Sequence, residues 1–242
     1  MHMPLNLKII FLSTCLLLTG CGEIDDNAKT PIEPADPNIM IQMAVEKQRI
    51  GAYDEAIDIL HRTLELDPQF VPAYNRMGLV YDEADQRKEA IKSFNKVLEL
   101  EPKNLQARLG LGKVYSKMTR NDLAVAEFLK AESLQPNNTE TLFKIALEYW
   151  YHQKNQEAAE YYQKVLVIDP DHTQAHLNLI SVYEELKDWK NAIKEIEISK
   201  RLGKEKNDSQ AIAIAERKKA FIKGRMNLTD EEYQRKSQPP FD

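Results

Sequence analysis

The hydrophobic and polar positions of the chain repeat every 34 residues from position 37 onward. Four prolines mark the period most clearly: Pro68, Pro102, Pro136 and Pro170. A constant period of this length is typical of a protein built from stacked supersecondary units. We therefore expect five units, which cover residues 37–70, 71–104, 105–138, 139–172 and 173–206.

Two columns of small residues recur at the same places in these units. The first is Ala44, Gly78, Gly112 and Ala146, with Ile180 as the exception, and the second is Ala56, Ala90, Ala124, Ala158 and Ala192. Small side chains let the two helices of a hairpin cross at close range. Bulky residues fill two more columns, which we expect to form the core: Tyr81, Tyr115, Tyr149 and Tyr183, and Leu60, Phe94, Phe128, Tyr162 and Ile196.

A leucine or isoleucine lies two residues before each of the four prolines. Proline cannot continue a helix, and it restricts the residue before it to extended geometry. Each unit is therefore predicted to be a helix, a turn and a second helix. Glycine is scarce, at 8 of 242 residues, which also favours an all-α protein over a turn-rich sheet protein.

One further helix is predicted at residues 207–224, with Asp208 or Ser209 as its N-terminal cap. It would cover the exposed apolar end of the last repeat. We expect residues 225–242 to form a mostly loose tail, with a short helix beginning at Thr229, where Glu232 completes a capping box.

The period, the small-residue columns, the tyrosine column and the terminal proline resemble those of the tetratricopeptide repeat family over residues 37–206. The resemblance implies an α-solenoid of five helix-turn-helix repeats with a C-terminal capping helix. The first repeat departs from the pattern with Lys47 in the tyrosine column, and the fifth departs with Ile180 and with Lys204 in place of the proline. Atypical end repeats are expected because each has only one neighbour.

The same resemblance implies that the first helices line a concave surface. The residues facing it would be Ile41, Gln42, Val45, Asn75, Arg76, Leu79, Gln106, Leu109, Lys113, Lys117, Phe143, Lys144, Leu147, Trp150, Tyr151, Leu177, Asn178 and Ser181. From this strip we predict ten residues that bind a peptide: Arg76, Leu79, Leu109, Lys113, Phe143, Lys144, Leu147, Trp150, Tyr151 and Asn178.

This mixture of apolar, cationic and amide side chains suits an extended peptide or a helix with apolar side chains and some acidic groups. Aromatic and arginine side chains usually dominate interface energetics. Trp150 and Tyr151 are therefore the strongest candidates, and the alternative is that both pack against the next repeat.

The N-terminus has the pattern of a signal peptide. Residues 1–8 carry only positive charge, and residues 9–18 are an apolar run that is too short to span a membrane. Leu18-Thr19-Gly20-Cys21 resembles a bacterial lipobox, which implies cleavage before Cys21 and covalent lipid on its sulfur. Residues 21–36 would then be a flexible tether. The alternative is an ordinary secretory signal with a chance cysteine.

Composition and charge exclude several classes of function. The net charge of −5 leaves no basic face suited to nucleic acid, and both cysteines precede residue 22, which excludes a cysteine-based zinc site in the folded part. We find no phosphate loop, no HExxH and no serine elbow. His172 and His176 have zinc-ligand spacing, but we interpret them as surface polar residues. We expect no catalytic residue, no metal and no cofactor besides the lipid on Cys21.

We therefore expect a lipid-anchored scaffold or adaptor of the bacterial cell envelope that binds a protein or peptide during assembly of an envelope complex, for example in pilus biogenesis or outer-membrane assembly. Gly22 follows the lipidated position, and by resemblance this favours the outer membrane. The alternative function is a regulator that recruits a peptidoglycan enzyme or a protease. An enzyme is the third possibility.

Overall fold

The computed structural model describes residues 36–238, and this part of the chain contains twelve α-helices and no strand. The helices are α1 (Pro37–Arg49), α2 (Tyr53–Leu66), α3 (Val71–Glu83), α4 (Arg87–Leu100), α5 (Leu105–Lys117), α6 (Asn121–Leu134), α7 (Thr139–Tyr151), α8 (Asn155–Ile168), α9 (Thr173–Glu185), α10 (Trp189–Glu205), α11 (Ser209–Met226) and α12 (Asp230–Lys236). The signal peptide, the lipobox with Cys21 and the tether as far as residue 35 lie outside the described residues.

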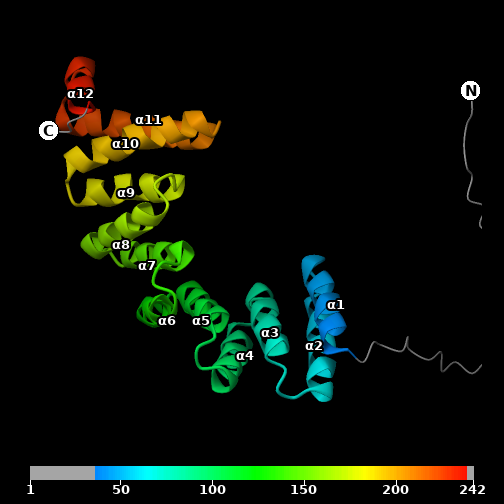
Figure 1. Ribbon diagram of the computed structural model, residues 1–242. Coiled ribbons are helices and arrows are strands. Elements are labelled where there is room, and N and C mark those ends of the chain that lie inside the picture. The colour runs from blue at the N-terminus through cyan, green and yellow to red at the C-terminus, as the bar shows by residue number, and fades with distance from the viewer. Residues whose placement is uncertain (1–35, 239–242) are drawn as a thin grey trace, which may run out of the picture. The chain divides into compact units, whose positions relative to one another are not determined.

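The helices form hairpins that follow one another along an α-solenoid (Figure 1). Helices α1, α3, α5, α7 and α9 begin 34 residues apart, and each packs against the helix that follows it in the chain. The predicted all-α solenoid is confirmed. Residues 34–242 form one compact unit, and its hydrophobic clusters are built from residues within that unit, so this part can fold on its own. No described helix is long and apolar enough to cross a membrane.

The small-residue column allows the close crossing that the sequence predicts. The Phe94 ring lies so near Gly78 that an added Cβ would be 2.6 Å from it, and a Cβ added to Gly112 would be 2.4 Å from the Phe128 ring. In the fifth repeat Ile180 replaces the small residue, Ile196 stands in the column of Phe94 and Phe128, and both isoleucines are fully buried in one cluster. The larger Ile180 is therefore accompanied by a side chain smaller than the ring, which keeps the space between the helices filled.

In three repeats the side chain of the fourth residue donates a hydrogen bond to the carbonyl of the proline near the end of the preceding repeat. The donor–acceptor pairs are the Tyr74 hydroxyl to the Pro68 carbonyl at 3.1 Å, the Arg108 guanidinium to the Pro102 carbonyl at 3.0 Å, and His176 Nε2 to the Pro170 carbonyl at 2.9 Å. Each bond reaches back six residues across the junction between repeats and so joins the next first helix to the turn before it.

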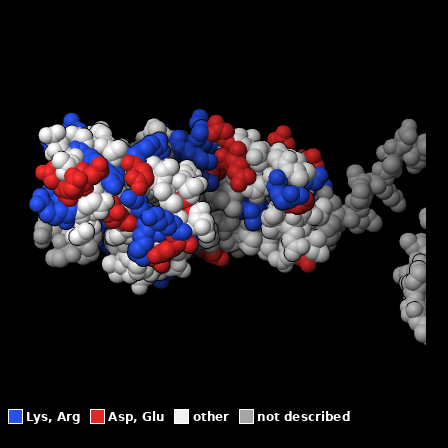
Figure 2. All heavy atoms as spheres, turned by 90° about the horizontal axis from the view of Figure 1, so that it is seen from above, with Lys and Arg blue, Asp and Glu red and all other residues white. Residues whose placement is uncertain are grey.

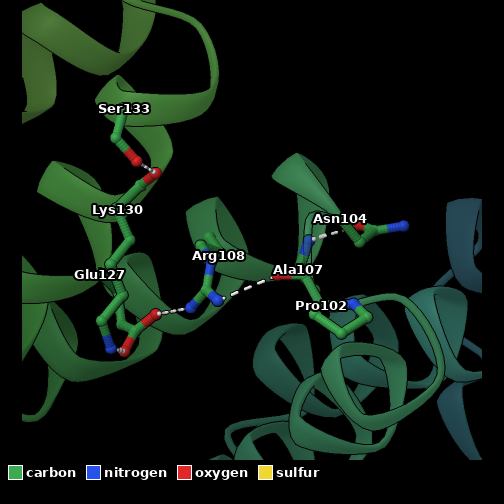
Figure 3. A network of polar contacts seen from close by, with 7 residues as sticks. All are labelled: Pro102, Asn104, Ala107, Arg108, Glu127, Lys130 and Ser133. Atoms are coloured by element: carbon green, nitrogen blue, oxygen red, sulfur yellow. Dashed lines mark hydrogen bonds and ion pairs between the residues drawn. The ribbon is translucent and has the colours of Figure 1, made fainter.

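Two of these side chains also contact a glutamate on the second helix of their own repeat. Arg108 contacts Glu127 at 2.8 Å (Figure 3), and His176 contacts Glu195, which lies at the equivalent place. The interpretation of His176 as a surface residue is wrong, since it is buried. Its two ring nitrogens lie within hydrogen-bond distance of the Glu195 carboxyl and the Pro170 carbonyl.

Helix α11 covers the last repeat as predicted, and it buries Ala211, Ala215 and Ile222. The expectation of a mostly loose tail is wrong for residues up to 238. Helix α12 begins at the predicted capping box, with Thr229 as its N-cap and Glu232 in its first turn. Tyr233 is fully buried and donates a hydrogen bond to Glu197 at 3.2 Å. One tyrosine with a partner for its hydroxyl thus anchors this short helix.

The turn inside each hairpin contains a residue with positive φ, at intervals of 34 residues. These residues are Gly51, Asp85, Thr119, Gln153 and Lys187. Only the first is glycine, the residue that adopts this left-handed conformation without steric cost. Four turns are therefore strained, and the β-branched Thr119, with a φ of 55°, is the least compatible with its backbone.

We predict that Thr119→Gly raises the free energy of unfolding by about 1 kcal/mol, because it removes the left-handed penalty. Urea denaturation of residues 34–242 measures the change. The matched control is Gly51→Thr, which lowers stability by a similar amount, since an added Cβ at Gly51 meets nothing within 4 Å and only backbone strain is introduced. Equal stability of all three proteins would contradict the strain.

Candidate interaction surface

The cations of the predicted strip have partners within the chain. Lys113 and Lys117 on α5 contact the same buried carboxylate, Asp82 on α3, at 3.0 and 2.7 Å. Arg76 donates to Gln48 at 3.2 Å. Lys144 pairs with Glu140 one turn earlier on α7, at 3.1 Å.

These pairs reduce the positive charge that is open to a partner. One carboxylate serves both lysines of α5, so this cluster keeps one net positive charge, and Arg76 keeps its own because Gln48 is neutral. The Lys144 pair is neutral overall. The surplus of positive charge therefore lies on α3 and α5. In Figure 2 basic and acidic side chains form small separate clusters on the face that is drawn.

The three predicted aromatic residues differ in exposure. Phe143 packs edge-on against Tyr162 and stacks on His172, with ring centroids 5.6 and 5.0 Å apart, so it serves the junction with the fifth repeat. Trp150 is half-buried against the largest hydrophobic cluster, whereas Tyr151 is 63% exposed and stacks on Trp150. Tyr151 is thus the aromatic side chain most available to a partner.

The predicted leucines and the asparagine are mostly covered. Leu109 is buried, and Leu79 and Leu147 are half-buried. Asn178 is buried and donates to the Tyr162 hydroxyl at 2.9 Å, so it connects α9 to α8. Three of the remaining strip residues are exposed, namely Gln42 and Val45 on α1 and Gln106 on α5. Ile41, Asn75 and Ser181 are half-buried, and Leu177 is buried.

A hollow of about 460 Å³ lies across α1, α3 and α5 on the first-helix side. Its walls are Ile41, Val71, Pro72, Asn75, Arg76, Leu79, Phe94, Glu101, Asn104 and Gln106. The Oδ1 atom of Asn75 is buried there without a hydrogen-bond partner. Half of this lining is apolar, and its polar half includes the Arg76 cation, the Glu101 carboxylate and the unused acceptor of Asn75. Such a hollow is suited to an apolar side chain of a peptide that also offers a hydrogen-bond donor.

Neighbouring first helices are joined by a series of polar contacts that the sequence analysis missed. The residues in the twelfth position make them: Gln48 with Arg76, Asp82 with Lys113 and Lys117, Ser116 with Glu148, and Glu184 with Lys218 of α11. The column was visible in the sequence, but its residue types differ from repeat to repeat. In the fourth repeat the same position holds Trp150, which packs instead of donating or accepting.

The carboxyl of Glu148 lies in an unusual environment on this surface. It is buried between α5 and α7, and its Oε2 atom has no hydrogen-bond partner. Burial raises the pKa of this carboxyl, while a hydrogen bond from Ser116 and the nearby His152 act in the opposite direction. Among residues 36–238 no group of three or more side chains could hold a metal ion.

A second hollow, of about 690 Å³, lies between the second helices α2 and α4, with Tyr74, Met77 and Tyr81 of α3 at its base. It remains open because the small Ser93 stands where Glu127 and Tyr161 stand in the next two repeats. Its rim mixes both signs of charge, whereas the cations of the predicted strip on the first helices outnumber the carboxylates that they contact. The first-helix surface therefore has the more selective chemistry.

Comparison with known proteins agrees with this architecture. Three family models of the tetratricopeptide repeat match residues 71–104, 105–138 and 143–203, which together are more than half of the 242 residues. No curated protein sequence matches the chain.

Several solved structures share the helix arrangement. The crystal structure of MamA protein has a TM-score of 0.64 at 22% identity and covers 72% of this chain and 94% of its own. MamA from Desulfovibrio magneticus RS-1 has a TM-score of 0.62 at 20% identity, with coverage of 72% and 97%. YrrB, described as a TPR protein with an unusual peptide-binding site, has a TM-score of 0.61 at 24% identity, with coverage of 76% and 93%. At these identities the similarity establishes the fold alone.

We predict that Glu148→Gln changes how stability depends on pH. With its pKa raised by burial, the folded protein keeps this proton to higher pH than the unfolded chain does, so the free energy of unfolding falls as pH rises through that range. The neutral amide removes this fall and leaves the variant at least as stable at pH 7. Denaturant midpoints between pH 4 and 8 measure it.

The control for this prediction is Glu160→Gln on α8, whose side chain is exposed. It should keep the pH profile of the unchanged protein. A Glu148→Gln protein that is less stable at pH 7 and has an unaltered profile would show that the carboxylate is ionised and well bonded, contrary to this account.

Proposed function

Because the chain belongs to the tetratricopeptide repeat family, we propose that it is a membrane-tethered scaffold whose first-helix surface binds a segment of a partner protein. The observation that carries the proposal is the hollow across α1, α3 and α5, with its apolar walls, the Arg76 cation and the unused acceptor of Asn75. The description of YrrB as a peptide-binding relative of the same fold supports it.

The charges and apolar groups indicate the chemistry of the partner segment. Arg76 and the lysines around Asp82 favour an acidic group near α3 and α5, and the hollow beside them accepts an apolar side chain. Further along, Tyr151 on Trp150 offers an exposed aromatic surface. The partner segment is therefore apolar with acidic residues toward one end, and it binds along the first helices.

The tether follows from the sequence pattern of the N-terminus. The lipobox-like Leu18-Thr19-Gly20-Cys21 supports lipid on Cys21, and more than one acyl chain gives a durable anchor. The scaffold would then act on the periplasmic or extracytoplasmic side of the bacterial envelope. Glycine at position 22, directly after the lipidated residue, favours the outer membrane. Its task would be to hold a component of an envelope complex, as in pilus or outer-membrane assembly.

A regulator that recruits a peptidoglycan enzyme or a protease would use the same surface. Purification of the complex separates the two functions. A stable stoichiometric partner without altered activity is the result for a scaffold, and a hydrolase whose rate changes on addition of the chain is the result for a regulator.

We predict that Tyr151→Ala and Leu79→Asp each weaken binding of the captured partner at least tenfold, about 1.4 kcal/mol, as expected for residues at the centre of an interface. Isothermal titration measures the affinity. The control is Val167→Asp on α8, since Val167 is 82% exposed on a second helix and should leave the affinity unchanged. Loss of affinity only with the α8 variant would place the interface elsewhere.

We predict that Cys21→Ser moves the protein from the membrane fraction to the soluble fraction, because no acyl chain can then be attached. Mass spectrometry of the unchanged protein should find a mature N-terminus at Cys21 that carries lipid. A mature N-terminus at another residue, or membrane association that survives the substitution, would contradict the tether.

A further inference from the structure

Helix α1 exposes a face that every later repeat covers. The third residue of repeats two to five is fully buried, as Ala73, Ala107, Thr141 and Ala175, because the preceding hairpin packs on it. In the first repeat this residue is Ile39, which is 44% exposed, and Ile50 at the end of the same helix is 60% exposed. The tenth residue of repeats two, three and five is also buried, as Val80, Val114 and Val182, whereas the tenth residue of the first repeat, Glu46, is exposed.

The other end of the described array has a similar uncovered face on α11. Its inner side is buried on α10, but its outer side exposes Ala213, Ala220 and Gly224, and Phe221 is 51% exposed. Nothing lies within 4 Å of a Cβ added to Gly224. The short α12 contacts the middle of α10 and of α11 through Tyr233, which bonds to Glu197 and lies under Lys219, and the four residues just named stay exposed beside it.

The two ends carry charge of opposite sign. Residues 36–186 contain 24 acidic and 17 basic residues, whereas residues 187–238 contain 9 acidic and 14 basic residues. The difference is strongest at the ends themselves. Helix α11 has five lysines and arginines against one glutamate, and residues 36–70 have seven acidic against three basic residues.

Terminal repeats of a solenoid usually present a polar outer face, which keeps the ends from associating. Here the outer face of α1 exposes Ile39 and Ile50, and the outer face of α11 exposes Phe221 beside small residues, while the charges of the two ends attract one another. We propose that a second copy of this chain covers these faces, with α11 of one copy packed on α1 of the next.

In this arrangement the isoleucines of α1 meet Phe221 and the small residues of α11. The small residues permit close approach, and the acidic first repeat and the basic α11 orient the two copies. The contact joins two different surfaces, so it is heterologous and does not close on itself; it produces linear assemblies rather than a symmetric dimer. This association is separate from the partner-binding surface of the first helices.

Sedimentation velocity of residues 34–242 tests the proposal. We expect association that grows with protein concentration and weakens with added salt. A head variant, Ile39→Asp with Ile50→Asp, and a tail variant, Ala213→Asp with Phe221→Asp, should each lower the association constant at least tenfold. All four positions are exposed, so circular dichroism should show unchanged folding. Val167→Asp, an exposed position far from both ends in the sequence, is the matched control and should associate like the unchanged protein.

A mixture of the two variants provides the decisive comparison. Each retains one intact end, so a head variant and a tail variant should combine into a one-to-one dimer and nothing larger. The proposal is overturned if the mixture stays monomeric, or if either variant alone associates like the unchanged protein. It is also overturned if the unchanged protein is monomeric at every concentration, which is the result expected when another segment of the chain or a different protein covers these faces.

Discussion

The close crossing of the two helices in each hairpin is the constraint on which the rest of the structure depends. A single hairpin cannot bury both of its apolar sides, so it needs a neighbour on each side. Glycine or alanine opposite a large ring brings the helices together, as Gly78 and Phe94 show. Repetition of this contact every 34 residues stacks the hairpins in one direction, and the first helices then line a single surface.

The sequence alone predicted the features that follow from repetition, because the period aligns equivalent positions and periodic burial reveals the core. It predicted less where a residue acts through a partner in another repeat. His176 was interpreted as a surface residue because its partner, Glu195, is 19 residues away and meets it only after folding. The same holds for Asp82 with the lysines of α5, and for Tyr233, whose burial depends on α10 and α11.

The candidate surface illustrates how one column can serve two purposes. Most residues in the twelfth position join neighbouring first helices, so cations that appeared free in the sequence hold the surface in shape. A partner therefore meets a preorganised strip, which lowers the entropic cost of binding. The side chains left for recognition are fewer than the sequence implied: Arg76, the lysines around Asp82, the walls of the hollow and Tyr151.

The central claim is that a partner lies along the first helices. Carbene footprinting of the full chain, with and without its captured partner, tests this claim most directly because it reports the solvent exposure of individual side chains. The account predicts loss of labelling at Leu79, Gln106 and Tyr151 and unchanged labelling at Val167. Protection of the hollow between α2 and α4, at His61 and Lys92, with no change at Tyr151, would contradict it.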